Sequence, residues 1–167
     1  MANKTVRAIL FLTVWALYGQ APLPRFDGET LTGRKLSMPG AVNGHTAVLV
    51  VGFTHASGPH CTDWANRLEN EFKNNHELER YSVVFLEDAP KLVRGMAVHG
   101  IKSGVTKKEY DNYLIVTEHE KEVKGAVRFS APDDAYLVLL APDGEVRWTY
   151  HGAVGDDPVR QLRELLK

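Results

Sequence analysis

The sequence lacks a second cysteine, an excess of charge of either sign and a long apolar run. Cys61 is the single cysteine among 167 residues, so the chain cannot form an internal disulfide and must be stabilised by packing. Twenty Lys and Arg residues against 21 Asp and Glu residues give a net charge of −1. Nucleic-acid binding requires a basic stripe that releases counterions, so we do not expect a nucleic-acid partner.

The apolar stretch at the N-terminus, residues 8–19, is shorter than the roughly 20 residues of a membrane span. Lys4 and Arg7 precede it and small residues follow up to Ala21, which is typical of a signal peptide. Pro22 directly after this site is unfavourable for cleavage, which leaves an uncleaved anchor open; a short buried helix is a third, less favoured interpretation. We expect residues 1–21 to be a signal peptide or membrane anchor and the protein to be extracytoplasmic, either periplasmic or membrane-anchored.

The remaining residues, 22–167, predict one α/β domain. Residues 46–53 and 81–86 are apolar runs rich in β-branched residues, typical of strands covered on both faces. Residues 26–38, 113–117, 135–140 and 145–150 predict further strands, with the turn signal Pro142-Asp143-Gly144 between the last two. We expect the charged residues at 107–108 and between 118 and 124 to form a solvated face.

Helical spacing of apolar residues predicts three helices. The first follows the strand at 46–53 and carries Trp64, Leu68 and Phe72 on the same face as Cys61, with Ser57 as its N-cap and Pro59 in its first turn. A second begins after Pro90, and a third follows Asp156 and Asp157 at the end of the chain.

The order of the predicted elements resembles that of the thioredoxin-like superfamily. It consists of a strand, a Gly-Pro loop, a cysteine at a helix start, a βαβ middle, a hairpin and a terminal helix. The resemblance implies a central mixed sheet with flanking helices and a C-terminal β-hairpin plus helix. The segment that matches the family's C-x-x-C motif is Gly58-Pro59-His60-Cys61. Gly58 thus stands where the nucleophilic cysteine would be, and Cys61 occupies the position of the more buried cysteine. The motif is degenerate, and a two-cysteine redox cycle within one chain is impossible.

The same resemblance implies a cis-proline opposite the motif, shortly before the final hairpin. Counting back from Asp143-Gly144, that place falls near Ala135, and Pro132 lies three residues earlier. Pro132 is therefore the candidate cis-proline, unless the proline has been lost.

The C-terminal third resembles, more narrowly, the mitochondrial ATP-synthase assembly factor (ATP10-like) family. The resemblance rests on residues 136–140, on residues 144–148 and on Gly152. It implies a thioredoxin-fold protein that need not keep the cysteine pair. Arg147 and Trp148 are candidate partner-binding residues because Trp and Arg dominate interface energetics, although a strand equally allows Trp148 to be core and Arg147 to be solvated.

Two other chemistries are less favoured. Phe53-Thr54-His55 resembles the start of the Sco copper-chaperone motif, but Ala56 and His60 occupy its two cysteine positions. His55, His60 and Cys61 are types that ligate Zn or Cu, yet no paired ligand spacing is present, so we predict no metal and no other cofactor. No series of Pro, Thr or Ser, and Cys leads to Cys61, so the sequence does not resemble a peroxiredoxin.

Two hypotheses of function remain. The first is a non-catalytic binding or assembly module, chaperone-like, whose partner is another protein, with a membrane complex as one option and membrane contact only through an uncleaved leader. The second is an enzyme, a thiol-dependent oxidoreductase in which Cys61 forms mixed disulfides with help from His60. We favour the first, because a free cysteine on an apolar helical face is most often a small buried hydrophobe.

Overall fold

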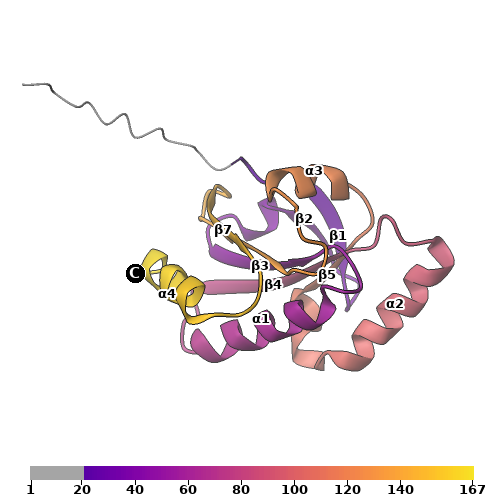
Figure 1. Cartoon of the computed structure of the whole chain (residues 1–167), viewed down its shortest axis with the longest axis horizontal. Helices are drawn as coiled ribbons and strands as arrows, with labels where there is room; N and C mark the ends of the chain where they lie inside the picture. The colour runs from indigo at the N-terminus through magenta and orange to yellow at the C-terminus, as the bar shows by residue number, and fades with distance from the viewer. Residues whose placement is uncertain (1–20) are drawn as a thin grey trace, which may run out of the picture.

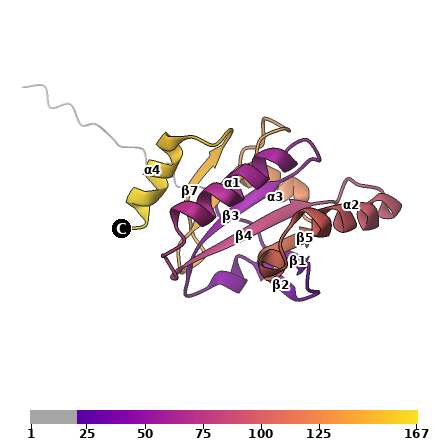
Figure 2. The same ribbon diagram turned by 90° about the horizontal axis from the view of Figure 1, so that it is seen from below.

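The computed structural model describes residues 21–167, which are organised around a seven-stranded mixed sheet (Figures 1 and 2). The predicted leader lies outside the described residues except for Ala21. The strands lie in the order β2-β1-β5-β4-β3-β6-β7. Their bounds are β1 (Phe26–Thr30), β2 (Lys35–Met38), β3 (Thr46–Gly52), β4 (Leu78–Phe85), β5 (Tyr113–Val116), β6 (Tyr136–Leu140) and β7 (Val146–His151).

The three central strands are parallel and the outer ones are antiparallel. β3 pairs with β4, and β4 with β5, in parallel register, with Val50 opposite Ser82 and Val84 opposite Ile115. β6 runs antiparallel to β3 and continues into β7 through the Pro-Asp-Gly turn, in which Gly144 adopts a positive φ of 84°. The predicted thioredoxin-like α/β sheet and its C-terminal hairpin are therefore confirmed.

Four α-helices and two short 3₁₀ helices surround this sheet in the described residues. Their bounds are η1 (Gly40–Val42), α1 (Gly58–Glu71), α2 (Lys91–Gly104), η2 (Lys107–Asn112), α3 (Glu120–Ala126) and α4 (Asp156–Leu165). Among residues 21–167, no helix has the length and apolar character needed to cross a membrane.

The two faces of the sheet carry separate apolar clusters, because side chains alternate along each strand. On β3, Val48 and Val50 pack in the cluster that α1 and α4 cover, and Leu49 packs in the cluster that α3 covers. Trp64 of α1 and Leu162 of α4 are completely buried in the first cluster. Figure 1 shows α1 and α3 on opposite sides of the sheet. This arrangement places the first turn of α1 beside the end of β3.

Helix α3 corrects the predicted solvated face at Glu120 and Lys124, whereas Glu118, Lys121 and Glu122 are exposed as expected. Glu120 is only 3% exposed, and its carboxylate contacts the Lys124 ammonium one helical turn later. The Lys124 Nζ also lies 4.8 Å from the centre of the Phe129 ring, a cation–π distance. The buried charges are thus paired, which a count of charged residues cannot reveal.

Candidate functional site

The candidate site lies where the loop after β3 enters α1. β3 ends at Gly52, and α1 begins at Gly58, so Cys61 sits one turn into the helix on its inner face. Gly58 and Pro59 are exposed, His60 is half-buried and Cys61 is 7% exposed. The degenerate motif therefore consists of an exposed pair, Gly58 and Pro59, the half-buried His60 and the buried Cys61 thiol.

The Cys61 thiol is pressed against the end of β3. A methyl group built on Gly52 would lie 2.9 Å from Sγ, closer than carbon and sulfur atoms can approach, so only glycine leaves room for the sulfur. Burial raises the pKa of Cys61 to about 11, although a hydrogen bond with the Ser57 side chain opposes the rise. At neutral pH only about one molecule in ten thousand then carries a thiolate there.

The start of α1 offers little stabilisation to an anion at position 58. The Gly58 N–H donates to the His55 carbonyl oxygen over 3.2 Å, and Pro59 has no N–H. The Cys61 N–H already makes a helical hydrogen bond to the Ser57 carbonyl oxygen, at 2.9 Å. Free amides at a helix N-terminus are what lower a thiol pKa, and two of the first three positions cannot supply one.

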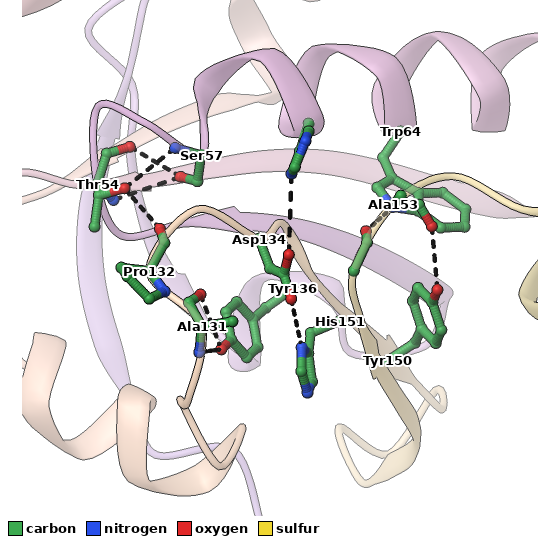
Figure 3. Close-up of polar contacts among 12 residues, drawn as sticks. Thr54, Ser57, Trp64, Ala131, Pro132, Asp134, Tyr136, Tyr150, His151 and Ala153 are labelled. Atoms are coloured by element: carbon green, nitrogen blue, oxygen red, sulfur yellow. Dashed lines mark hydrogen bonds and ion pairs between the residues drawn. The ribbon is translucent and has the colours of Figure 1, made fainter.

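Ser57 precedes α1 as predicted, but its hydroxyl does not cap the helix. Ser57 Oγ instead donates to the Thr54 carbonyl oxygen at 2.9 Å, and the Ser57 N–H donates to Thr54 Oγ1 at 3.1 Å. Ser57 is completely buried, so these bonds lock the loop into one tight turn (Figure 3). The prediction of a capping hydroxyl is therefore wrong, because the hydroxyl bonds within the turn before the helix.

Pro132 lies across from this turn, as the thioredoxin resemblance implies. Thr54 Oγ1 donates to the Pro132 carbonyl oxygen at 2.7 Å, which joins the loop before α1 to the loop before β6 (Figure 3). The peptide bond before Pro132 is trans, however, and the cis peptide bond among the described residues joins Met38 to Pro39. Pro132 is thus wrongly predicted as the cis-proline.

The loop that carries Pro132 is held from below by Tyr136. The N–H groups of Ser130 and Ala131 both donate to the Tyr136 hydroxyl oxygen at 2.9 Å, and that hydroxyl donates to the Ala131 carbonyl oxygen at 3.2 Å. Tyr136 is 1% exposed and stacks on Phe129, whose ring centre is 5.5 Å away. The loop is therefore positioned by a buried phenol.

Two histidines face one carboxylate beside this loop. The His151 Nδ1 and the Asp134 Oδ2 are 2.7 Å apart, and the His60 Nδ1 lies 4.0 Å from the Asp134 Oδ1. Asp134 thus contacts the end of β7 directly and lies near, but not within hydrogen-bond distance of, His60 in the first turn of α1. Sequence reasoning missed Asp134 and His151 because only the pairing of β6 with β7 brings them to His60. Within residues 21–167, no group of three or more His, Cys, Asp and Glu side chains is arranged to hold a metal ion.

A cavity of about 390 Å³ opens on the other side of Cys61, between α1, β4 and η2. Three of its charged side chains form ion pairs: the Arg80 Nη2 lies 3.1 Å and the Lys108 Nζ 3.5 Å from the Glu69 carboxylate. The Glu109 carboxylate in its wall accepts hydrogen bonds from Thr106. Burial raises the pKa of the Tyr113 hydroxyl in its wall to about 12, so this phenol is not a base at neutral pH. The cavity supplies Cys61 with no group that would activate the thiol.

Arg147 and Trp148 lie on β7, at the edge of the sheet. Arg147 is exposed, whereas Trp148 is half-buried, stacks on Tyr150 and donates from Nε1 to the Gln161 Oε1 at 3.1 Å. Trp148 thus joins β7 to α4. The structure does not bring either residue to Cys61.

The sequence model of the ATP10 protein family matches residues 15–167. No curated protein sequence matches the chain. Among solved structures, the thioredoxin domain of a thiol-disulfide oxidoreductase from Bacteroides vulgatus is 17% identical, with a TM-score of 0.62, over 91% of this chain and 100% of that one.

Two further solved structures share this fold. An exposed lipoprotein thioredoxin from Streptococcus pneumoniae is 12% identical, with a TM-score of 0.61, over 84% of this chain and 98% of that one. BsSco, a member of the Sco family of cytochrome c oxidase assembly proteins, is 15% identical, with a TM-score of 0.58, over 88% of this chain and 94% of that one. At these identities the likeness shows the fold alone.

Proposed function

The chain belongs to the ATP10 protein family, and from this premise we propose that it is a non-catalytic assembly module that binds another protein outside the cytoplasm. The observation that carries the proposal is the state of Cys61. The thiol is buried with a pKa of about 11, and the position of the usual nucleophile holds Gly58. A thioredoxin-like scaffold in this condition can hold a partner but has no reactive sulfur at its surface.

The proposed contact face is the edge where the loop before α1 meets the loop before β6. Gly58, Pro59 and Pro132 are exposed there, and Thr54 and Tyr136 hold the two loops rigidly. A preorganised surface loses little conformational entropy when a partner binds. The structural likeness to BsSco, itself from a family of assembly proteins, supports an assembly role on this scaffold.

The proposed location rests on the sequence. Residues 1–21 have the charge pattern and apolar length of a leader, and one structural neighbour is an exposed lipoprotein. A single thiol that is buried is also well suited to an oxidising compartment, because it cannot pair with the thiols of other proteins.

The decisive experiment is alkylation of the native chain with iodoacetamide as a function of pH. Because Cys61 is the only thiol, incorporation of label reports on this residue alone. We expect slow labelling at pH 7 and a rate that rises about tenfold per pH unit until the pKa near 11, whereas the chain in urea labels rapidly from about pH 8.5.

Gly58→Cys in a Cys61→Ser background is the positive control, because its single thiol cannot form a disulfide with Cys61. A side chain at position 58 meets no other atom within 4 Å, so an added thiol would be exposed and should label quickly at pH 7. Fast labelling of the native wild-type chain at pH 7 would instead support the monothiol oxidoreductase. Under our proposal, a Cys61→Ser chain complements a strain that lacks the wild-type gene.

A further inference from the structure

Helix α2 differs from the other α-helices of the described chain because none of its side chains is buried. Leu92 is 87% exposed, Met96 is 74% exposed and Val93 is 46% exposed. Leu92 and Met96 are four residues apart and therefore neighbours on one helical face, with Val93 beside them. We call these three side chains the apolar ridge. Figures 1 and 2 both show α2 at the opposite end of the molecule from α4.

The charges on α2 are of one sign. The helix carries Lys91, Arg94 and Lys102 and no carboxylate, in a chain whose net charge is −1. Arg94 is engaged internally, because its guanidinium donates to the carbonyl oxygens of Ala89 and Glu87. Lys91 and Lys102 are exposed and, at helical spacing, both flank the ridge on the same side.

Two carboxylates, those of Glu87 and Asp88, come just before α2, and the Asp88 side chain is 85% exposed. The Glu87 Oε2 accepts a hydrogen bond from the Glu120 N–H at 2.7 Å, and the Asp88 Oδ2 lies 3.7 Å from the Lys124 Nζ. Both contacts are with α3, so they draw these carboxylates towards that helix. The charged side chains of α2 itself are all basic, and Lys102 also lines a cavity with Asp27, Glu29 and Glu118.

The sequence of α2 makes it a weak helix on its own. Gly95 and Gly100 lie within it, and a methyl group at either position would meet no atom within 4 Å, so neither glycine is needed for close packing. Glycine disfavours a helix relative to alanine, and no buried side chain compensates. A binding surface that covers the ridge would supply the missing stabilisation.

We propose that α2 docks on an anionic lipid surface, with Leu92, Val93 and Met96 in the boundary between headgroups and acyl chains and with Lys91 and Lys102 near lipid phosphates. A bilayer offers both an apolar layer and a negative surface, and helices with an apolar side flanked by lysines bind there. A second copy of the chain fits less well, since two such ridges facing each other would bring lysines together. This inference is independent of the chemistry of Cys61.

The ridge spans little more than one helical turn, so by itself it binds weakly and reversibly. If residues 1–21 are an uncleaved membrane anchor, one of the two options that the sequence leaves open, the tether raises the local concentration of α2 at the membrane. α2 would then set how the domain is oriented on the bilayer. This is a membrane contact beyond the leader.

The test uses the full chain. Because the tether and the ridge can both bind lipid, the measurement follows the amides of α2 separately. Hydrogen exchange is followed by mass spectrometry without vesicles, with phosphatidylcholine vesicles and with vesicles of phosphatidylcholine and phosphatidylglycerol. We expect amides of residues 91–104 to exchange about tenfold more slowly on the anionic vesicles only, while those of α4 are unchanged. Added salt should reduce the protection.

Variants distinguish binding through the apolar ridge from nonspecific adsorption to the vesicles. Leu92→Ser combined with Met96→Ser should abolish the protection of α2, and Lys91→Glu combined with Lys102→Glu should weaken vesicle affinity about tenfold. Leu165→Ser, at a 51% exposed apolar residue of α4, is the matched control and should retain the wild-type pattern. All these side chains are exposed, so the variants should fold.

Three results would overturn the proposal: no protection of α2 on any vesicle, equal protection on neutral vesicles, or unchanged protection in the Leu92 and Met96 variant. Protection without vesicles that grows with protein concentration would assign the ridge to self-association and also refute lipid docking. None of these outcomes bears on the alkylation of Cys61, so the two proposals fail separately.

Discussion

At the scale of single residues, Gly52 and Gly58 have opposite surroundings although they flank the same loop. A methyl group on Gly52 would lie 2.9 Å from the Cys61 Sγ and 3.1 Å from the Ser57 Oγ, whereas one on Gly58 would meet nothing within 4 Å. Gly52 is therefore required for packing and Gly58 is not. Because the space at position 58 is open, packing does not require a glycine there. What the missing side chain removes is the nucleophile of the motif.

Gly52→Ala should lower the free energy of unfolding by about 1–3 kcal/mol, because the methyl group must displace the sulfur or the strand. Urea denaturation monitored by circular dichroism measures this. Gly58→Ala is the matched control and should change stability by less than about 1 kcal/mol.

Cys61→Ala introduced together with Gly52→Ala should recover part of the loss, because it removes the atom that the new methyl group meets. Equal destabilisation by the Gly52 and Gly58 variants would contradict the close approach of Gly52 to Cys61.

At the scale of elements, α1 is fastened to the segment between β7 and α4 by one buried side chain. Trp64 is completely buried, and its Nε1 donates to the Gly152 carbonyl oxygen at 2.9 Å (Figure 3). Gly152 has a φ of 124°, a conformation that favours glycine, so the carbonyl is held in place by the turn. The helix that carries Cys61 is thus tied to the C-terminal hairpin.

Trp64→Phe should reduce the free energy of unfolding by about 2–3 kcal/mol, because it leaves a gap in the core and an unpaired carbonyl at Gly152. Trp148→Phe is the control. It removes a hydrogen bond to the exposed Gln161, so we expect a loss below about 1 kcal/mol. Chemical denaturation of both variants measures the two losses of stability. A larger loss for Trp148→Phe than for Trp64→Phe would contradict the importance of the Trp64 contact.

At the scale of the whole molecule, buried acids that stay protonated make folding sensitive to alkali. Burial raises the pKa of Cys61 from 9.0 to about 11, and it raises the pKa of Tyr81 and of Tyr113 from 10.0 to about 12. Below pH 9 both the folded and the unfolded chain hold these protons. Above pH 9 the unfolded chain releases them first, so stability falls with rising pH.

The contribution of Cys61 to this loss should be about 2–3 kcal/mol between pH 9 and pH 11, since one pKa unit corresponds to about 1.4 kcal/mol. The measurement is urea denaturation from pH 7 to pH 11 under reducing conditions. A Cys61→Ala variant should show a shallower fall over this range, whatever its stability at pH 7. Parallel curves for the two chains would mean that the folded chain does not hold the thiol proton.

The patterns that are local in sequence were sufficient for most of the framework. Alternating or continuous apolar runs predict the strands, Pro142-Asp143-Gly144 predicts the hairpin, and helical spacing predicts α1, α2 and α4. Short α3 was missed, because Glu120 and Lys124 look like solvated charges until the sheet buries one against the other. The position of Cys61 on the inner face of α1 also follows from spacing alone.

The sequence by itself thus predicted the strands and most of the α-helices, because these depend on residue types and short-range periodicity. The family and the loss of the nucleophilic cysteine followed from the resemblance to thioredoxin-like proteins. Only the tertiary structure decided the bonding of Ser57, the trans bond before Pro132, the approach of His60 to Asp134 and the exposure of the α2 ridge. The last three depend on how segments far apart in the chain pack, as Thr54 and Pro132 do across 78 positions. Ser57 bonds locally to Thr54, three residues before it, and so does not cap α1. Local patterns show that a side chain is apolar or polar, but packing determines what it meets.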